Sequence, residues 1–307
     1  MKFALRSLLL GLFALSANLS PAAAQTQLIP ETTFSRMQST DLPGFDIRFL
    51  RDTTLEICQA ACVDDASCAA IAYNTAANAC FLKTEGATPA PFNGAVSYFI
   101  NRTPQATLDL AKTRALDLEP LPNFWFTRAY AQASSVALSY RADEMPAQAL
   151  AELALDASNV NNYDAVASYF TRALAQSDRF DLWLSYGQTM SASPRSSDHA
   201  SGRSALVNAY LRSNEPGAQA DILVTIAAQL EADGYGRNTI PLLRTALAYA
   251  PTEDTTRALE RAIGLFGFRI VEHQVDNNAA QPRFCLTFSD PLVQTGVDYA
   301  PFVRMQG

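Results

Sequence analysis

The sequence has little of what most enzymes and nucleic-acid-binding proteins need. Only two histidines, His199 and His273, occur among its 307 residues, and they lie far apart. Lys and Arg total 23 against 30 Asp and Glu, a net charge of -7, so there is no basic stripe to neutralise phosphates. With 49% hydrophobic residues, 13 Gly and 16 Pro, the chain is neither disordered nor collagen-like. We expect two or three folded domains, with no nucleic-acid partner.

Catalytic motifs are also missing. No nucleophile elbow, zinc-protease helix or phosphate-binding loop occurs, and Gly234–Gly236 is a lone G-x-G that predicts a turn. His199 lies in a polar run that predicts a solvated loop, and His273 alternates with valines on a predicted strand. The adjacent carboxylates Asp64–Asp65 and Glu253–Asp254 are typical of helix caps and solvated turns. We assign no catalytic, cofactor-binding or metal-ligating residue and expect no enzyme.

Residues 1–24 have the pattern of an export signal. Lys2 and Arg6 precede a short apolar run over 8–15, and the small residues of 21–24 predict cleavage before Gln25. The run is too short for a membrane-spanning helix, which needs about 20 apolar residues. Removing two basic residues leaves 21 against 30 acidic ones, a net charge of -9. We expect an exported chain in the periplasm or extracellular space, without a membrane anchor.

Four of the five cysteines cluster in the next segment, residues 25–103. A predicted helix over 55–62 places Cys58 and Cys62 on one face, four residues apart. Cys68 follows Cys62 after a tight loop, and Cys80 lies on a predicted strand, so we favour Cys58–Cys80 and Cys62–Cys68. Spacing alone leaves three connectivities open. A metal site is the competing interpretation, disfavoured by export and by the absence of a nearby histidine.

The runs 54–62, 68–74 and 80–83 together resemble the PAN/apple domain family. The resemblance implies a short helix joined by two disulfides to a small antiparallel sheet, and a ligand that is a protein or a carbohydrate. The disulfide that joins the two termini in longer apple domains is missing here. Alternating and apolar runs at 45–49 and 96–100 independently predict strands.

Residues 104–264 change to a helical pattern, rich in alanine and without cysteine. The segment 180–190 has the Trp, aromatic and Gly spacing of a first tetratricopeptide helix, in which Gly187 allows a paired helix to approach closely. Further positions match the 34-residue template: Leu223, Ile226, Ala227 and Leu230, then Leu243, Ala246 and Pro251, with Thr239 in place of Ala. A looser copy runs from Ala133, Val136, Ala137 and Tyr140 to Ala149 and Leu153, and Phe170 with Ala173 resembles part of another second helix.

Such helical hairpins stack, because each leaves one apolar side uncovered, and they form a curved array with a concave face open to partners. The alternative is a helical bundle without repeats that spaces its neighbours.

The last segment, 265–307, switches to period two. Runs at 268–275 and 283–289 predict two strands. Because two strands cannot form an independent core, we expect an incomplete β domain here. Cys285, the fifth cysteine, is expected to be unpaired in this chain or paired with a cysteine beyond residue 307.

Residues 267–270, 282–292 and 298–303 resemble the opening of the first macroglobulin-type β-sandwich in bacterial alpha-2-macroglobulins. The resemblance implies the N-terminal part of a periplasmic endopeptidase inhibitor, a protease trap whose bait and thioester lie outside this chain. Proteases would then be partners through the longer protein. The alternative is a secreted adaptor built from the PAN module and helical repeats, without inhibitor activity.

The predicted fold class is α+β and multidomain. It comprises a signal peptide (1–24), a disulfide-bonded PAN/apple module (25–103), a TPR-like α-helical array (104–264) and an incomplete macroglobulin-type β-sandwich (265–307).

Overall fold

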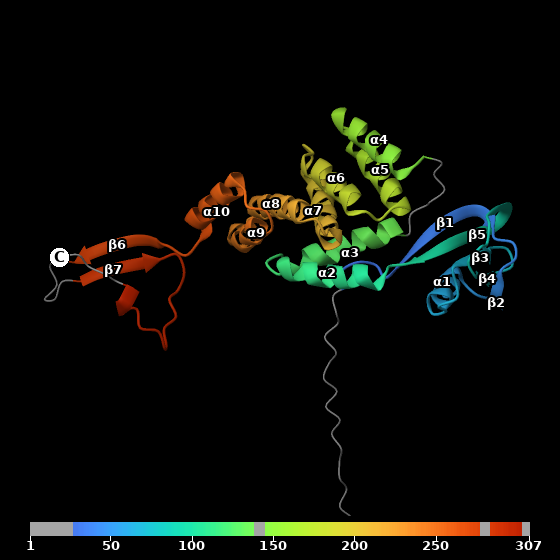
Figure 1. The fold of residues 1–307 in the computed structure, drawn as a ribbon, viewed down its shortest axis with the longest axis horizontal. Coiled ribbons are helices and arrows are strands. Elements are labelled where there is room, and N and C mark those ends of the chain that lie inside the picture. The colour runs from blue at the N-terminus through green and yellow to red at the C-terminus, as the bar shows by residue number, and fades with distance from the viewer. Residues whose placement is uncertain (1–26, 138–144, 277–282, 303–307) are drawn as a thin grey trace, which may run out of the picture.

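The computed structural model describes residues 27–137, 145–276 and 283–302. Within these ranges the chain forms a five-stranded sheet with one helix, then nine further α-helices, then a two-stranded hairpin. The sheet module and the hairpin lie at opposite ends of the helical array (Figure 1). The signal-peptide prediction for residues 1–24 lies outside the described residues.

The first unit is an antiparallel sheet with the strand order β1-β5-β3-β4-β2. Its strands include the two that the sequence predicts at 45–49 and 96–100. The elements are β1 (Thr32–Asp41), β2 (Asp46–Leu50), α1 (Leu55–Val63), β3 (Ala70–Asn74), β4 (Ala79–Lys83) and β5 (Ala90–Arg102).

Helix α1 covers one face of this sheet and is held there by two disulfides. It begins after Thr54, whose side chain accepts a hydrogen bond from the Ile57 N–H. Cys58 is joined to Cys80 on β4, and Cys62 to Cys68, which is the pairing that the sequence analysis favours. All four cysteines are fully buried in the core between α1 and the sheet. In so small a module each bridge contributes about 2–4 kcal/mol to stability.

The end of α1 is capped by an arginine from the last strand. The Arg102 guanidinium donates to the carbonyl oxygens of Cys68 at 2.9 Å, Cys62 at 3.0 Å and Asp65 at 2.8 Å. A cation is favourable here because the last carbonyls of a helix have no partner within the helix and carry partial negative charge. Arg102 therefore fastens the helix end and the Cys62–Cys68 loop to β5.

The second unit is built from helical hairpins. Helix α4 pairs with α5, α6 with α7 and α8 with α9, while α10 packs on α9, and α2 and α3 pack on α7. The helices are α2 (Gln105–Asp117), α3 (Asn123–Ala137), α4 (Ala147–Asn159), α5 (Tyr163–Gln176), α6 (Phe180–Ser191), α7 (Ser196–Arg212), α8 (Pro216–Ala232), α9 (Gly236–Tyr249) and α10 (Glu253–Phe266).

Two of the predicted helix pairs correspond to hairpins of the structure. In α6–α7, a Cβ at Gly187 would lie 2.8 Å from Leu206 Cγ and 3.0 Å from the Leu206 backbone nitrogen, so the two helices are as close as predicted. In α8–α9, the apolar positions named from the sequence are buried.

The prediction that the looser copy from Ala133 to Leu153 forms a helical hairpin is wrong. The segment with Ala133 and Val136 lies in α3, which packs on α7, α5 and β1, whereas α4 pairs with α5. Asn208 of α7 donates to the Ala129 carbonyl of α3 at 2.8 Å, which ties α3 to α7. Phe170, predicted on a second helix, lies in α5 and is fully buried. Tyr140 lies outside the described residues.

A shared carboxylate locks α2 onto the array. Asp117 Oδ2 accepts hydrogen bonds from the hydroxyls of Tyr210 at 2.7 Å and Tyr249 at 2.8 Å. Arg114 donates to the Tyr249 hydroxyl at 2.8 Å. Burial, and then the Asp117 carboxylate, raise the pKa of Tyr210, so its hydroxyl stays a donor at all ordinary pH. One acidic side chain thus joins α2, α7 and α9.

The third unit is the hairpin of β6 (Ile270–Asp276) and β7 (Arg283–Phe288), followed by a 3₁₀ turn at Ala300–Phe302. It matches the two predicted strands. Every residue of β6 is exposed, and no third strand joins the hairpin within the described residues. An ion pair between Arg237 and Asp290 connects the segment after β7 to α9. The residues described here form a lone hairpin and not a sandwich.

The close packing at Gly187 predicts that two Gly→Ala substitutions change the stability of the protein in opposite directions. Gly187→Ala should lower the free energy of unfolding by about 1–3 kcal/mol, because the Leu206 backbone cannot move away without separating α6 from α7. Gly264→Ala, in α10 with nothing within 4 Å of the new methyl, should raise it by about 0.5–1 kcal/mol. Urea unfolding followed by circular dichroism measures both. Equal effects of the two variants would contradict the packing.

The Arg102 cap generates a second prediction. Arg102→Ala should lower the stability of the disulfide-bonded module by about 1–2 kcal/mol, because it leaves several carbonyl oxygens without their charged donor. Arg36→Ala removes an exposed arginine that bonds only its neighbour Gln38 among the described residues, and should change stability by less than about 0.5 kcal/mol. Thermal unfolding under non-reducing conditions compares them, and an Arg36 effect as large as that of Arg102 would refute the cap.

Candidate functional site

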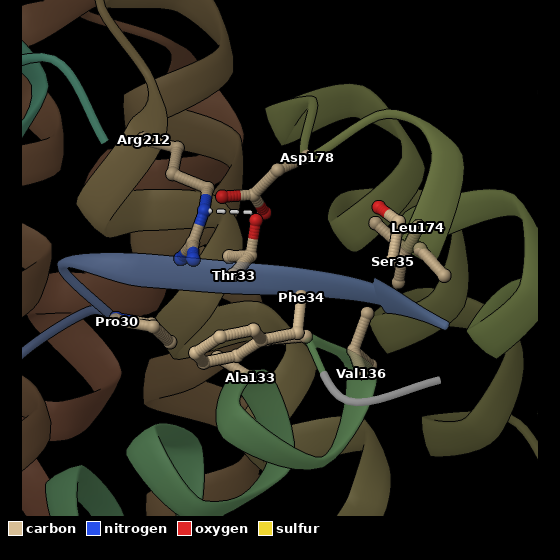
Figure 2. Close-up of a pocket in the computed structure, with 11 residues that line it drawn as sticks. Pro30, Thr33, Phe34, Ser35, Ala133, Val136, Leu174, Asp178 and Arg212 are labelled. Atoms are coloured by element: carbon tan, nitrogen blue, oxygen red, sulfur yellow. Dashed lines mark ion pairs between the residues drawn. The ribbon is translucent and has the colours of Figure 1, made fainter. Parts of the chain in front are cut away.

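Strand β1 packs against the helical array and so connects the sheet module to it. We call the contact of Phe34 with α3, together with the Arg212–Asp178 ion pair, the joint. Figure 2 shows Phe34 on one side of the strand, against Ala133 and Val136 of α3, and an ion pair of Arg212 with Asp178 on the other side. The cavity left between these groups measures about 40 Å³, room for a single water molecule. The site is therefore a packed joint and not a ligand pocket.

On the charged side of the joint a buried arginine is paired with a half-exposed carboxylate. Arg212 Nε lies 2.8 Å from Asp178 Oδ1, off the direction of a hydrogen bond, and the Arg212 side chain is 4% exposed. Arg212 Nη1 donates to Asn208 Oδ1 at 2.9 Å, and the guanidinium lies over the Trp183 ring. Trp183 Nε1 donates to Asp178 at 2.6 Å. These partners offset the cost of burying the guanidinium charge.

At the opposite edge of the sheet, aromatic and cationic side chains from β2, β4 and the residue after β2 form a partly exposed cluster. We call Phe49, Arg51, Phe81 and Lys83 the Phe49–Phe81 cluster. The rings of Phe49 and Phe81 stack with centroids 4.7 Å apart. The Arg51 guanidinium lies 5.2 Å from the Phe49 ring centre, and Lys83 Nζ lies 5.4 Å from that of Phe81. The cluster lies on the sheet face opposite α1, because Phe81 packs with Ala70 and Ala72 rather than with the cysteines.

The two cations of the cluster differ in what they can offer a ligand. The Lys83 side chain is 4% exposed, and its Nζ donates to Asp46 Oδ1 at 2.6 Å and to the Gly44 carbonyl at 3.0 Å. Its charge is therefore already compensated. Arg51 is exposed and has only the Phe49 ring beneath it among the described residues. The solvent-facing part of the cluster is the Phe49 ring with the Arg51 guanidinium.

A strained aromatic residue directly precedes β2. Phe45 has a φ of 60° and is 52% exposed, and it follows Gly44 at a φ of 72°. A bulky side chain in the left-handed region costs about 1–3 kcal/mol and is concentrated at functional sites. The Phe45 ring lies over Gly86, where a Cβ would be 3.0 Å from it. The backbone is thus held in a form that keeps a third phenylalanine at the surface beside β2.

The sequence alone does not predict this cluster. Its signal is present, because an aromatic residue is followed two positions later by a cation in both strands, Phe49 with Arg51 and Phe81 with Lys83. Alternation by two places both on one face of a strand. What the sequence does not show is that Phe49 lies opposite Phe81 in the β2–β4 register.

The residues considered for chemistry do not come together. His199 lies on α7 and not in a loop, because the helix begins at Ser196, and its Nε2 is 2.8 Å from the Ser193 carbonyl oxygen. His273 is on exposed β6, and Cys285 is free and exposed on β7. Across the parts of the chain that the structure describes, no group of three or more His, Cys, Asp or Glu could hold a metal ion.

The paired carboxylates have structural roles. Asp64 ends α1 through its backbone N–H, which donates to the Ala60 carbonyl, and the Asp65 carboxylate accepts hydrogen bonds from the hydroxyl of Ser67 at 2.6 Å and its N–H at 3.0 Å. These bonds, from the side chain first, lower the pKa of Asp65. Glu253 and Asp254 lie in the first turn of α10, where negative charge is favourable. In the described ranges no helix is both long and apolar enough to cross a membrane.

Comparison with known proteins identifies one part of the chain. Residues 32–103 match the model of the PAN domain family. Comparison with curated proteins gives no match, and comparison with solved structures gives none. The matched range begins at the first residue of β1 and ends one residue after β5, so it coincides with the sheet unit. With its two disulfides and a helix clipped to a small antiparallel sheet, this unit is a PAN/apple module.

Proposed function

We propose that this chain is an exported binding protein whose PAN module recognises a protein or a carbohydrate through the Phe49–Phe81 cluster. The observation that carries the proposal is the position of this cluster at the sheet edge that faces away from the helical array, while the array holds the other edge through β1 (Figure 1). PAN modules commonly bind proteins or carbohydrates.

The chemistry of the cluster suits either kind of ligand. A few aromatic and arginine anchors supply most of the energy at binding surfaces, and both residue types are present here. Phe49 is 42% exposed, but its ring is fixed between Arg51 and Phe81, so little side-chain entropy is lost when a ligand covers it. The disulfides fit an extracellular or secreted protein, since such bonds persist in oxidising compartments.

The proposal predicts a residue-specific loss of binding. Phe49→Ala should weaken binding to any ligand found on glycan and peptide arrays at least tenfold, about 1.4 kcal/mol, since it removes the fixed ring. Phe92→Ala is the matched control, because Phe92 is 49% exposed on β5 and lies outside the cluster. Biolayer interferometry with the full disulfide-bonded chain measures both. Equal losses in the two variants, or none, would reject the cluster as the binding surface.

A second proposal is that this chain is the N-terminal part of a macroglobulin-type protease trap. The observation that favours it is the β6–β7 hairpin, which no third strand joins within the described residues and whose apolar side chains are exposed: Ile270, Val271, Val275 and Phe284 are each 48–59% exposed. Two strands do not make a stable core, so further strands would need to cover them. In this case the PAN module and the helices would present or position the trap.

The trap proposal is tested by the reading frame and by protease assays. A run of further β-sandwich domains encoded after the Gly307 codon, with inhibition of a large-substrate protease assay by the longer product, would support it. A stop codon at that point, together with no effect of the folded chain on trypsin or elastase, would reject it and leave the binding protein as the function.

A further inference from the structure

Strand β2 is an open edge of the PAN sheet. In the strand order β1-β5-β3-β4-β2 it has a single neighbour, β4, and no other described segment forms a strand beside it. The other edge, β1, is covered by α3 and the buried groups of the joint. In an edge strand every second residue directs its N–H and C=O groups away from the sheet, so β2 offers donors and acceptors to a further strand, most regularly after the irregularity between Asp46 and Arg48.

The side chains at β2 give this edge of the sheet a positive charge. Arg48 and Arg51 are exposed, and within the described ranges neither has an ion-pair partner; Arg48 makes only a 3.5 Å contact with the Ala61 carbonyl oxygen. Asp46 is compensated by Lys83 at 2.6 Å. A positive charge therefore stands on each side of Phe49 along the chain: Arg48 within β2, which interacts electrostatically with Asp65 without an ion pair, and Arg51 directly after the strand.

The spacing of these charges specifies the partner further. Arg48 and Arg51 are three positions apart, so their side chains lie on opposite faces of the sheet. Residues directly opposite each other on neighbouring strands share a face of the sheet. A strand added to β2 would therefore place an acidic residue opposite each arginine only if its two acidic residues were also three positions apart. The two residues between them would face Leu50 and Phe49 and are best apolar.

A second copy of this chain fits less well. Antiparallel pairing of two β2 strands about a two-fold axis at Arg48 would place that arginine opposite itself, and like charges directly opposite are destabilising. The arginines therefore act against self-association of the edge and in favour of an acidic strand.

We propose that β2 binds an extended segment of a partner protein as an added strand, and that the segment has two acidic residues separated by two apolar ones. This inference deepens the proposed binding function and rests on it. Backbone hydrogen bonds to β2 supply affinity that does not depend on sequence, and the pairs of the acidic residues with Arg48 and Arg51 supply specificity.

Synthetic peptides test this directly on the full disulfide-bonded chain. The probe is acetylated Thr-Glu-Val-Phe-Glu-Thr amide, and its controls replace both Glu with Lys or move the second Glu one position closer to the first. We expect the probe to bind at least tenfold more tightly than either control. NMR or hydrogen exchange should show new protection of amides in Asp46–Arg51 when it binds.

Charge reversal supplies the matched variants. Arg48→Glu with Arg51→Glu should transfer the preference to the lysine peptide, whereas Arg36→Glu, an exposed arginine on β1, should leave the preference unchanged. All three arginines are exposed, so the fold should persist in both variants, and circular dichroism checks this. No binding, equal binding of the three peptides, protection away from β2, or a wild-type dimer paired through β2 in sedimentation and exchange experiments would each overturn the proposal.

Failure of the added-strand proposal can be distinguished from failure of the proposed binding function. If a ligand found on arrays depends on Phe49 but the peptides do not bind β2, the PAN module binds through its aromatic face and the added strand is wrong. If array ligands bind the Phe49→Ala variant as tightly as the unmodified chain, the Phe49–Phe81 cluster is not the binding surface.

Discussion

The packing of β1 against the helices is the constraint on which the arrangement of this protein depends. β1 pairs along its length with β5 as part of the sheet. The same strand places Phe34 on α3 on one side, and the ion pair of buried Arg212 with half-exposed Asp178 lies on the other side. Just before it, Ile29 is 3% exposed within the core of the helical array. One segment thus belongs to two units, and the module is fixed by the edge that would otherwise be open.

The chain crosses between the two units twice at nearly the same place. Thr103, at the exit from β5, donates from its hydroxyl to the Pro30 carbonyl at 2.6 Å and from its backbone N–H to the Glu31 carbonyl at 2.9 Å. The entry and the exit are therefore bonded to each other. A module held by two bonded crossings and a packed strand keeps one orientation, which leaves β2 and the Phe49–Phe81 cluster directed away from the helices.

The sequence predicts those features that depend on local spacing. The cysteine positions indicate the disulfides because a helix places Cys58 beside Cys62, and the contact at Gly187 follows from a local helical pattern. Features that depend on distant pairing are missed. Periodicity shows that the helix with Ala133 and Val136 has an apolar face, but not that β1 and α7 cover it in place of α4. Likewise the Phe49–Phe81 stack needs the register of two strands more than thirty residues apart in the chain. The sequence predicts a loop at His199, which is wrong, because the helix that starts among these polar residues has no side-chain cap to mark its beginning.

The measurement that tests the central claim most directly is a set of residual dipolar couplings from the full chain in a weakly aligned medium. Couplings from residues 32–103 and from helices α2 to α9 should fit one alignment tensor of the same magnitude and orientation, because β1 makes the module and the array a single rigid body. Two tensors of different magnitude would mean that the module moves independently, and would contradict the account of how β2 is held outward.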